Sequence, residues 1–197
     1  AIQTNNLFFK PVSDQRMYDA SSQTESIKLR LSAEEDKYIE YQYTLAPDKY
    51  SVDYKVIFKN MSGIMPPNQN SITLDWKQYI PQQEKGRQNE ESYTTIKYKY
   101  YQDDEVAYLR YKSNKEIDEA DITTKLDWVA FQDQFFSSIL VADDFFLNGT
   151  VSSTKTITSK KYNLNEFMNF NLKMKKKDFE VFLFIGSVLK ENNVFVI

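Results

Sequence analysis

The sequence predicts an all-β protein of the sandwich or barrel type, and three observations support that prediction. Apolar side chains recur at every second position in several segments, turn-forming residues separate these segments, and helical periodicity is nearly absent. Aromatic residues make up 15% of the 197 residues, with 14 Tyr and 14 Phe, and both types favour strands. Many short strands with a turn every 8–12 residues or so argue against a βαβ fold.

The strands are justified by alternation along the chain. Apolar residues alternate with polar ones in five runs, namely 27–31, 50–58, 72–76, 96–100 and 179–185. The segment Ala46-Pro47-Asp48-Lys49 predicts a turn, and residues 63–70 predict a loop. Residues 95–101 and 106–111 predict a hairpin, while Asn148-Gly149 is the strongest signal for a two-residue hairpin turn.

Little of the chain predicts helix. Residues 115–125 can hold one short helix, and Ser187 can cap another over residues 188–192. Residues 1–25 lack any regular pattern over most of their length, so we expect a loosely structured N-terminal segment. Because no break in composition marks a boundary, we expect one domain over residues 1–197.

The composition excludes many kinds of chemistry. The sequence has no Cys and no His, which removes disulfides, thiolate nucleophiles, His-ligated metals and imidazole proton shuttles. With only 4 Gly there is no glycine-rich phosphate-binding motif. A net charge of −3 disfavours nucleic acid as a partner. We therefore expect no catalytic residue, no metal and no cofactor.

Clustered carboxylates are the remaining candidates for catalysis. They occur at residues 34–36, 90–91, 103–105 and 143–144, all in expected turns, where acidic side chains are usually solvated. An enzyme that uses only carboxylates needs two of them about 5–10 Å apart in a pocket. This reading is the weakest of three hypotheses for the function.

Aromatic and amide side chains are the candidates for binding. Most aromatic residues at period two belong to a core, but part of the Tyr-rich hairpin must face outward. The segment from Trp128 to Val141 predicts two adjacent buried strands with a polar kink at Gln132-Asp133-Gln134, which can form a binding rim. The binding residues that we predict are Trp76, Tyr100, Tyr108, Trp128, Gln132 and Gln134.

No apolar run approaches the ~20 residues that a membrane-spanning helix needs. The chain begins with Ala, so we expect a processed or excised piece whose compartment is set by sequence outside it. Lys173 and the lysines at 175–177 predict a solvated turn, with an anionic lipid surface as the alternative partner.

Several motifs occur in an order that resembles one family. Trp128-Val-Ala-Phe-Gln-Asp-Gln-Phe-Phe resembles the W-[VI]-A-x-x-x-Q-[YF]-F stretch in the periplasmic domain of YidC-type membrane protein insertases. Two motifs that come earlier in that family are similar to Thr44-Leu-Ala-Pro-Asp48 and Tyr50-Ser-Val-Asp-Tyr54 of this chain. A third similar stretch runs from Trp76 to Arg87. The chain departs from the family's sequence pattern at one position, because it has Ser187 where the family usually has Pro.

The resemblance implies a β-super-sandwich similar to galactose mutarotases, on the periplasmic face of the bacterial inner membrane. It implies a non-catalytic domain that supports membrane protein insertion and contacts Sec-translocon components or nascent membrane proteins. Membrane contact would occur only through segments outside this chain, and the isolated domain would be a monomer. A carbohydrate-binding, mutarotase-like domain is the alternative, although the His-dependent mutarotase mechanism is impossible here because the sequence has no His.

Overall fold

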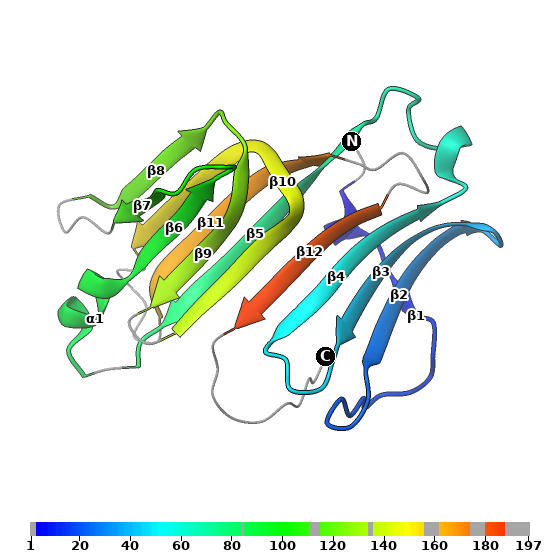
Figure 1. The fold of residues 1–197 in the computed structure, drawn as a ribbon, viewed down its shortest axis with the longest axis horizontal. Helices are drawn as coiled ribbons and strands as arrows, with labels where there is room; N and C mark the ends of the chain where they lie inside the picture. Colours follow the sequence, from blue (N-terminus) through cyan, green and yellow to red (C-terminus); the bar gives the residue numbers. More distant parts are fainter. Residues whose placement is uncertain are drawn as a thin grey trace. The chain divides into compact units, whose positions relative to one another are not determined.

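A computed structural model of the chain describes residues 3–83, 85–110, 115–133, 136–155, 162–173 and 180–187. Within these ranges the chain forms twelve strands, one α-helix and two short 3-10 helices. Figure 1 shows how the strands are arranged. The all-β prediction with a short helix is therefore confirmed. The chain divides into two compact units, of which the first includes Ala1–Asn70 and the second includes Ser71–Lys173.

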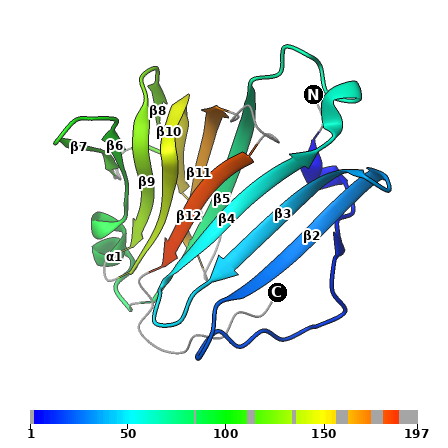
Figure 2. The same cartoon turned by 45° about the vertical axis from the view of Figure 1, so that its right-hand side comes forward.

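The first unit is an antiparallel sheet in the strand order β1-β2-β3-β4-β12. Figure 2 shows its strands β2, β3 and β4 side by side. The elements are η1 (Thr4–Asn6), β1 (Lys10–Pro11), β2 (Glu25–Glu34), β3 (Lys37–Leu45), β4 (Ser51–Lys59), η2 (Met61–Gly63) and β12 (Glu180–Ser187). The turn at residues 46–49 is present as predicted, with Asp48 at a φ of 55° and the Lys49 amide donating to the Ala46 carbonyl.

Register gives this sheet one apolar face and one polar face. Tyr41 and Tyr43 of β3 lie opposite Val56 and Tyr54 of β4, on the face that carries the apolar residues of β2. The Tyr43 and Tyr54 rings stack with centroids 4.7 Å apart, and burial raises the pKa of Tyr54. The strand alternation read from the sequence therefore separates an aromatic core from a polar surface within this unit.

The second unit is built around one long strand, β10 (Phe136–Lys155), which curves along its length in Figure 1. Its first half pairs with β9 in a path that runs β10-β9-β6-β7. Its second half pairs with β11 on one side and β8 on the other, and β11 also pairs with β5. The elements are β5 (Ser71–Pro81), α1 (Arg87–Tyr93), β6 (Thr95–Tyr100), β7 (Val106–Arg110), β8 (Ile117–Ile122), β9 (Leu126–Asp133) and β11 (Tyr162–Lys173).

An aromatic contact links the two halves of this unit. The ring of Trp76 on β5 lies 4.4 Å from the ring of Phe131 on β9, centroid to centroid. Phe131 is 1% exposed, and Val129, two residues earlier on the same face of β9, is fully buried. Side chains of β5 and β9 thus pack against each other in the core of the second unit.

Two predictions about local structure are wrong. Residues 115–125 form no helix, because Ile117–Ile122 is strand β8, paired along its length with β10. Asn148-Gly149 is not a hairpin turn but lies inside β10, where the pairing with β11 shifts register between Phe146 and Asn148. Gly149 pairs with Ile122 on one side and Phe170 on the other, so two neighbouring strands hold this segment extended.

Other predictions are confirmed, and one element was missed. The hairpin of β6 and β7 has its turn at Gln102, whose φ is 60°, and the adjacent strands expected between Trp128 and Val141 are β9 and β10. Helix α1, which begins after Gly86, was not predicted. The helix expected after Ser187 lies outside the described residues, as do the lysines at 175–177.

Candidate functional site

One face of the β10-β9-β6-β7 sheet collects several of the predicted binding residues. Tyr108 lies opposite Lys97, which lies opposite Ala130, so the three side chains share a face. The same register places Trp128 opposite Lys99 and Val141. We call this surface the Trp128 face and define it by Val106, Tyr108, Trp128, Gln132, Ile139 and Val141.

The Trp128 face is partly open to solvent. Tyr108 is 59% exposed and Val106 is 43% exposed, whereas the other four members are half-buried. Between them Lys99 pairs with Asp127 at 2.8 Å, in the segment where the β6–β9 register shifts. Tyr108 and Trp128 each combine an apolar ring system with one polar group, and the Lys99–Asp127 pair lies nearby. Such a surface is suited to binding apolar polypeptide segments.

Strand β7 is the last strand in the order β10-β9-β6-β7, so it lies at the edge of the sheet. Its outward side chains are Val106 and Tyr108, whereas Leu109 is buried against the other face. An edge strand offers backbone donors and acceptors to a further strand, and its side chains then select what binds. The Trp128 face and the β7 edge therefore form one continuous candidate site.

The structure separates the predicted binding residues into groups. Tyr108, Trp128 and Gln132 share the Trp128 face, whereas Trp76 packs on Phe131 against the opposite face of β9. Tyr100 ends β6 and is half-buried, with its ring in edge contact with Tyr98. Gln134 lies outside the described residues. Ile139 and Val141 were not singled out, because they lie in the continuous apolar run Ile139-Leu-Val-Ala142, which gives no signal of period two.

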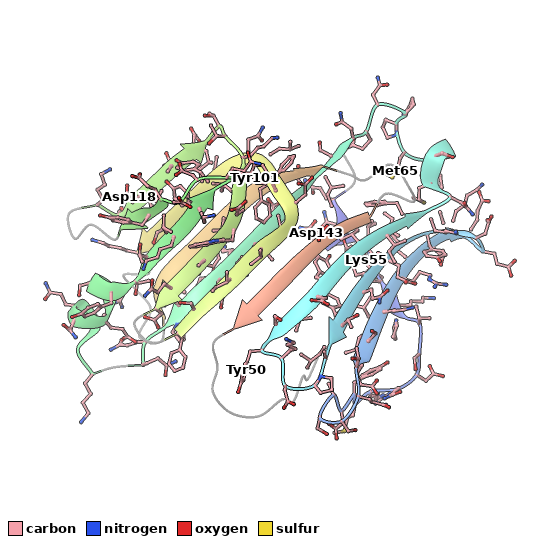
Figure 3. All side chains as sticks on the ribbon, in the orientation of Figure 1. Tyr50, Lys55, Met65, Tyr101, Asp118 and Asp143 are labelled. Atoms are coloured by element: carbon pink, nitrogen blue, oxygen red, sulfur yellow. The ribbon has the colours of Figure 1, made fainter. Side chains whose placement is uncertain are left out.

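An open hollow of about 900 Å³ lies elsewhere on the second unit. It is bordered by the turn after β6, the β8–β9 connection and the middle of β10. Its lining residues include Tyr100, Tyr101, Asp103, Asp121, Thr124 and Asn148. The Tyr101 ring packs edge-on against Phe145, and the ammonium of Lys125 lies 3.9 Å from the Phe145 ring centre (Tyr101 is labelled in Figure 3).

Acidic residues 90–91 are not solvated in a turn, which corrects that expectation. Both belong to α1, where Glu90 is 1% exposed and Glu91 is 6% exposed. The Gln83 amide donates to Glu90 at 2.7 Å, and Arg87 pairs with Glu91 at 2.6 Å. Gln83, just after β5, and Arg87, one helical turn before Glu91, supply the contacts that allow the two carboxylates to be buried.

Asp133 completes this buried acidic group from the end of β9. It is 7% exposed, and the Thr94 hydroxyl donates to its Oδ1 at 3.3 Å. Burial, followed by the nearby charge of Glu90, raises the pKa of Asp133 to about 6, against the lowering effect of the Thr94 hydrogen bond. The group joins α1, β6 and β9 at one end of the sheet.

No cluster of three or more acidic side chains placed to hold a metal ion occurs among the described residues. In the same ranges no helix has the length and apolar character needed to cross a membrane.

Comparisons with known proteins identify relatives over nearly the whole chain. The chain is 33% identical over 152 residues to the membrane protein insertase YidC of Parabacteroides distasonis, covering 77% of this chain and 22% of that protein. It is 31% identical over 207 residues to the protein of the same name from Azobacteroides pseudotrichonymphae, covering 98% of this chain and 32% of that protein. The chain thus spans at most about a third of these two relatives.

A solved structure with a similar fold is a galactose mutarotase related enzyme from Lactobacillus acidophilus. The similarity covers 97% of this chain and 74% of that one, with a TM-score of 0.45 and 10% sequence identity. A similarity at this level says nothing about activity. The family model of the YidC periplasmic domain matches residues 1–187. With that match and these relatives, the chain belongs to the YidC periplasmic domain family.

Proposed function

We propose that this domain supports membrane protein insertion and assembly as a binding module without chemistry, by contacting Sec-translocon components or exported chains. The domain belongs to a family of domains on the periplasmic face of the bacterial inner membrane. The observation that carries the proposal is the Trp128 face, where Val106 and Tyr108 of the edge strand β7 are exposed.

The mode of binding follows from the physics of that surface. A partner segment in extended conformation adds to the β7 edge through backbone hydrogen bonds, while its alternate side chains contact the Trp128 face. Such recognition tolerates many sequences, because backbone bonds carry no sequence information and aromatic surfaces accept most apolar groups. That tolerance suits a module that meets many different exported chains.

The absence of chemistry is supported by composition. The sequence has no His or Cys to move protons or attack carbonyl groups near neutral pH. Of the carboxylates, Glu90 and Asp133 are buried and hydrogen-bonded, while Asp103 and Asp121 line an open hollow. A domain with this inventory is better equipped to bind than to catalyse.

The test is binding of a fluorescently labelled extended peptide with alternating apolar residues, measured by anisotropy. We expect Tyr108→Ala to weaken binding about tenfold, since exposed aromatic residues at the centre of an interface commonly contribute this much. The matched control is Tyr50→Ala, because Tyr50 is 64% exposed but belongs to the first unit and is no part of the Trp128 face. The control should bind within about twofold of the original chain.

Two further variants separate binding from folding. Trp76→Ala removes a ring that packs on Phe131, so it should lower the stability of the domain while the Trp128 face stays intact in the folded fraction. Trp128→Ala should weaken peptide binding more than it lowers stability, because Trp128 is half-buried on the open face. Equal losses of binding for Tyr108→Ala and Tyr50→Ala would contradict the proposal.

Carbohydrate binding is a second candidate, favoured by the hollow. Its border carries two tyrosines, two aspartates, two threonines and an asparagine, which are residue types that stack on sugar rings or bind their hydroxyl groups. Titration with galactose and glucose, followed by tyrosine and tryptophan fluorescence, distinguishes the two candidates. Millimolar sugar binding that Tyr101→Ala abolishes, together with no peptide binding, would favour the second candidate over the first.

A further inference from the structure

Lys97 places a positive charge in the middle of the Trp128 face. On one side it lies opposite Tyr108 of the edge strand β7, and on the other side it lies opposite Ala130 of β9. Side chains at directly opposed positions of a sheet have Cβ atoms about 5 Å apart, so Lys97 adjoins both residues. The Lys97 side chain is half-buried. A cation thus lies one strand inward from the edge, on a face whose other members are mostly aromatic or aliphatic.

The charge of Lys97 is not cancelled within the domain. In the part of the chain that the structure describes, Lys97 has no ion-pair partner, whereas Lys99 on the same strand is paired with Asp127 at 2.8 Å. The register places the acidic turn at residues 103–105, together with Asp143, on the Lys99 side of the face and away from Lys97 (Asp143 is labelled in Figure 3). The described acidic side chains therefore leave Lys97 available to an anion from outside.

A partner that covers the Trp128 face has to compensate this charge. In the free domain, the stem of a lysine can cover apolar surface while its ammonium group stays in water. A wholly apolar segment laid over the face would remove that water and supply nothing in exchange, which is unfavourable for an unpaired cation. A segment that brings one carboxylate to the same place replaces the lost water with a charge-assisted hydrogen bond.

We infer that the Trp128 face selects extended polypeptide segments in which one acidic side chain is flanked by apolar ones, and that Lys97 recognises the carboxylate. A strand added beside β7 lies two strands from Lys97, or about 10 Å, a gap that the side chains of Lys and Glu can span together. Side chains on one face of a strand recur every second residue. An acidic residue placed opposite Tyr108 therefore has an apolar residue two positions away, opposite Val106.

This inference rests on the proposed function and names the kind of exported chain that the site receives. In membrane proteins, Lys and Arg are concentrated in the cytoplasmic loops, so the segments that reach the periplasmic side carry few of them. A lysine on a periplasmic binding face therefore rarely meets a like charge, and it can pair with carboxylates that have no cation of their own. The expected occupants are periplasmic segments of membrane proteins that combine apolar residues with Glu or Asp.

The test uses three labelled peptides with the same alternating apolar pattern, which carry Glu, Gln or Lys at the central position, and anisotropy measures their binding. The original chain should bind the Glu peptide about fivefold more tightly than the Gln peptide, and the Lys peptide most weakly, because one partly exposed ion pair contributes about this factor. Salt at about 500 mM should remove most of the preference for Glu. Lys97→Gln should bind the Glu and Gln peptides equally, and Lys97→Glu should prefer the Lys peptide.

The matched control is Lys28→Gln, which removes one exposed lysine from the first unit and changes the net charge equally. It should keep the preference for the Glu peptide within about twofold. Circular dichroism checks that each variant is folded. Equal binding of the three peptides by the original chain, or a preference for Glu that survives Lys97→Gln, would overturn the inference but not the proposed function, provided that Tyr108→Ala still weakens all three. No binding of any peptide would overturn both.

Discussion

At the scale of single residues, the buried carboxyl of Asp133 is the most consequential feature of the second unit. Its pKa is raised to about 6 by burial and by the charge of Glu90, against an ordinary value of 3.8. A folded state that holds a proton more tightly than the unfolded state loses stability as pH rises between these two values. Near neutral pH the carboxylate therefore destabilises the fold by about 2–3 kcal/mol.

We predict that Asp133→Asn removes this pH dependence. The amide oxygen can still accept from Thr94, and the charge that burial disfavours is gone. Compared with the original chain, the variant should gain about 2 kcal/mol of stability at pH 7.5 and little or nothing at about pH 3, where the carboxyl is mostly protonated in both folded and unfolded states. Urea unfolding at the two pH values measures the difference.

A variant whose gain is the same at both pH values would contradict this account, because the effect would then come from packing rather than from the titration of Asp133.

The sequence did not reveal the buried acidic group. Glu90-Glu91 looks like any solvated acidic pair, and its partners Gln83 and Arg87 reach the two carboxylates only once helix α1, which was not predicted, has formed. Periodicity predicts which face a side chain occupies, but not whether a partner satisfies its charge.

At the scale of strands, alternation of apolar and polar residues predicted most of the sheet. The runs at residues 27–31, 50–58, 72–76 and 96–100 all lie in strands, with the single-residue exception of Tyr50 at the start of β4. Such runs are readable because one face is buried and the other is solvated, which imposes period two on the sequence. Tyr108 and Trp128 also lie in strands, as predicted from the hairpin signal at residues 95–111 and from the dense apolar segment between Trp128 and Val141.

The elements that the sequence did not predict are those decided by neighbours. Residues 117–122 have strand structure because β10 pairs with them residue by residue, despite an Ile-Asp-Glu-Ala-Asp-Ile sequence of low strand preference. Asn148-Gly149 has strong turn chemistry but sits between two paired strands, so a register shift replaces the hairpin. Cross-strand pairing that involves residues far apart in sequence leaves no local signal.

Strands β2 and β3 are joined by a charged pair as well as by their backbones. Glu40 is buried beneath Arg30, which also covers the Tyr38 ring. We predict that Arg30→Ala destabilises the domain by about 2 kcal/mol, because it leaves a buried carboxylate without its cation. The value is below that for a fully buried pair, since Arg30 is partly exposed. Urea unfolding at neutral pH measures it.

The matched control for this prediction is Lys28→Ala, two residues earlier on the same face of β2. Lys28 is exposed and lies opposite the uncharged Gln42, so its removal should change stability by less than about 0.5 kcal/mol. Similar losses for the two variants would mean that the pair contributes nothing beyond the loss of a long side chain from the strand.

At the scale of the whole molecule, each of the two units presents a surface that its own core does not use. The first unit has the polar face of its sheet, and the second has the Trp128 face beside the β7 edge. The sequence predicted the family and the strand character of both surfaces. It did not predict which aromatic residues lie on the open face, because Trp76 and Trp128 both lie in expected strands and are both half-buried, and only the packing of Trp76 on Phe131 distinguishes them.

The central claim is that the second unit contacts polypeptides through the Trp128 face. The most direct test places a photo-crosslinking amino acid at position 106, 108 or 50 in the full-length protein and irradiates it in its own membrane. Positions 106 and 108 should yield crosslinks to exported chains or translocon subunits, and position 50, which is more open to solvent than either, should not. Crosslinks of the same strength from position 50, or none from 106 and 108, would contradict the claim.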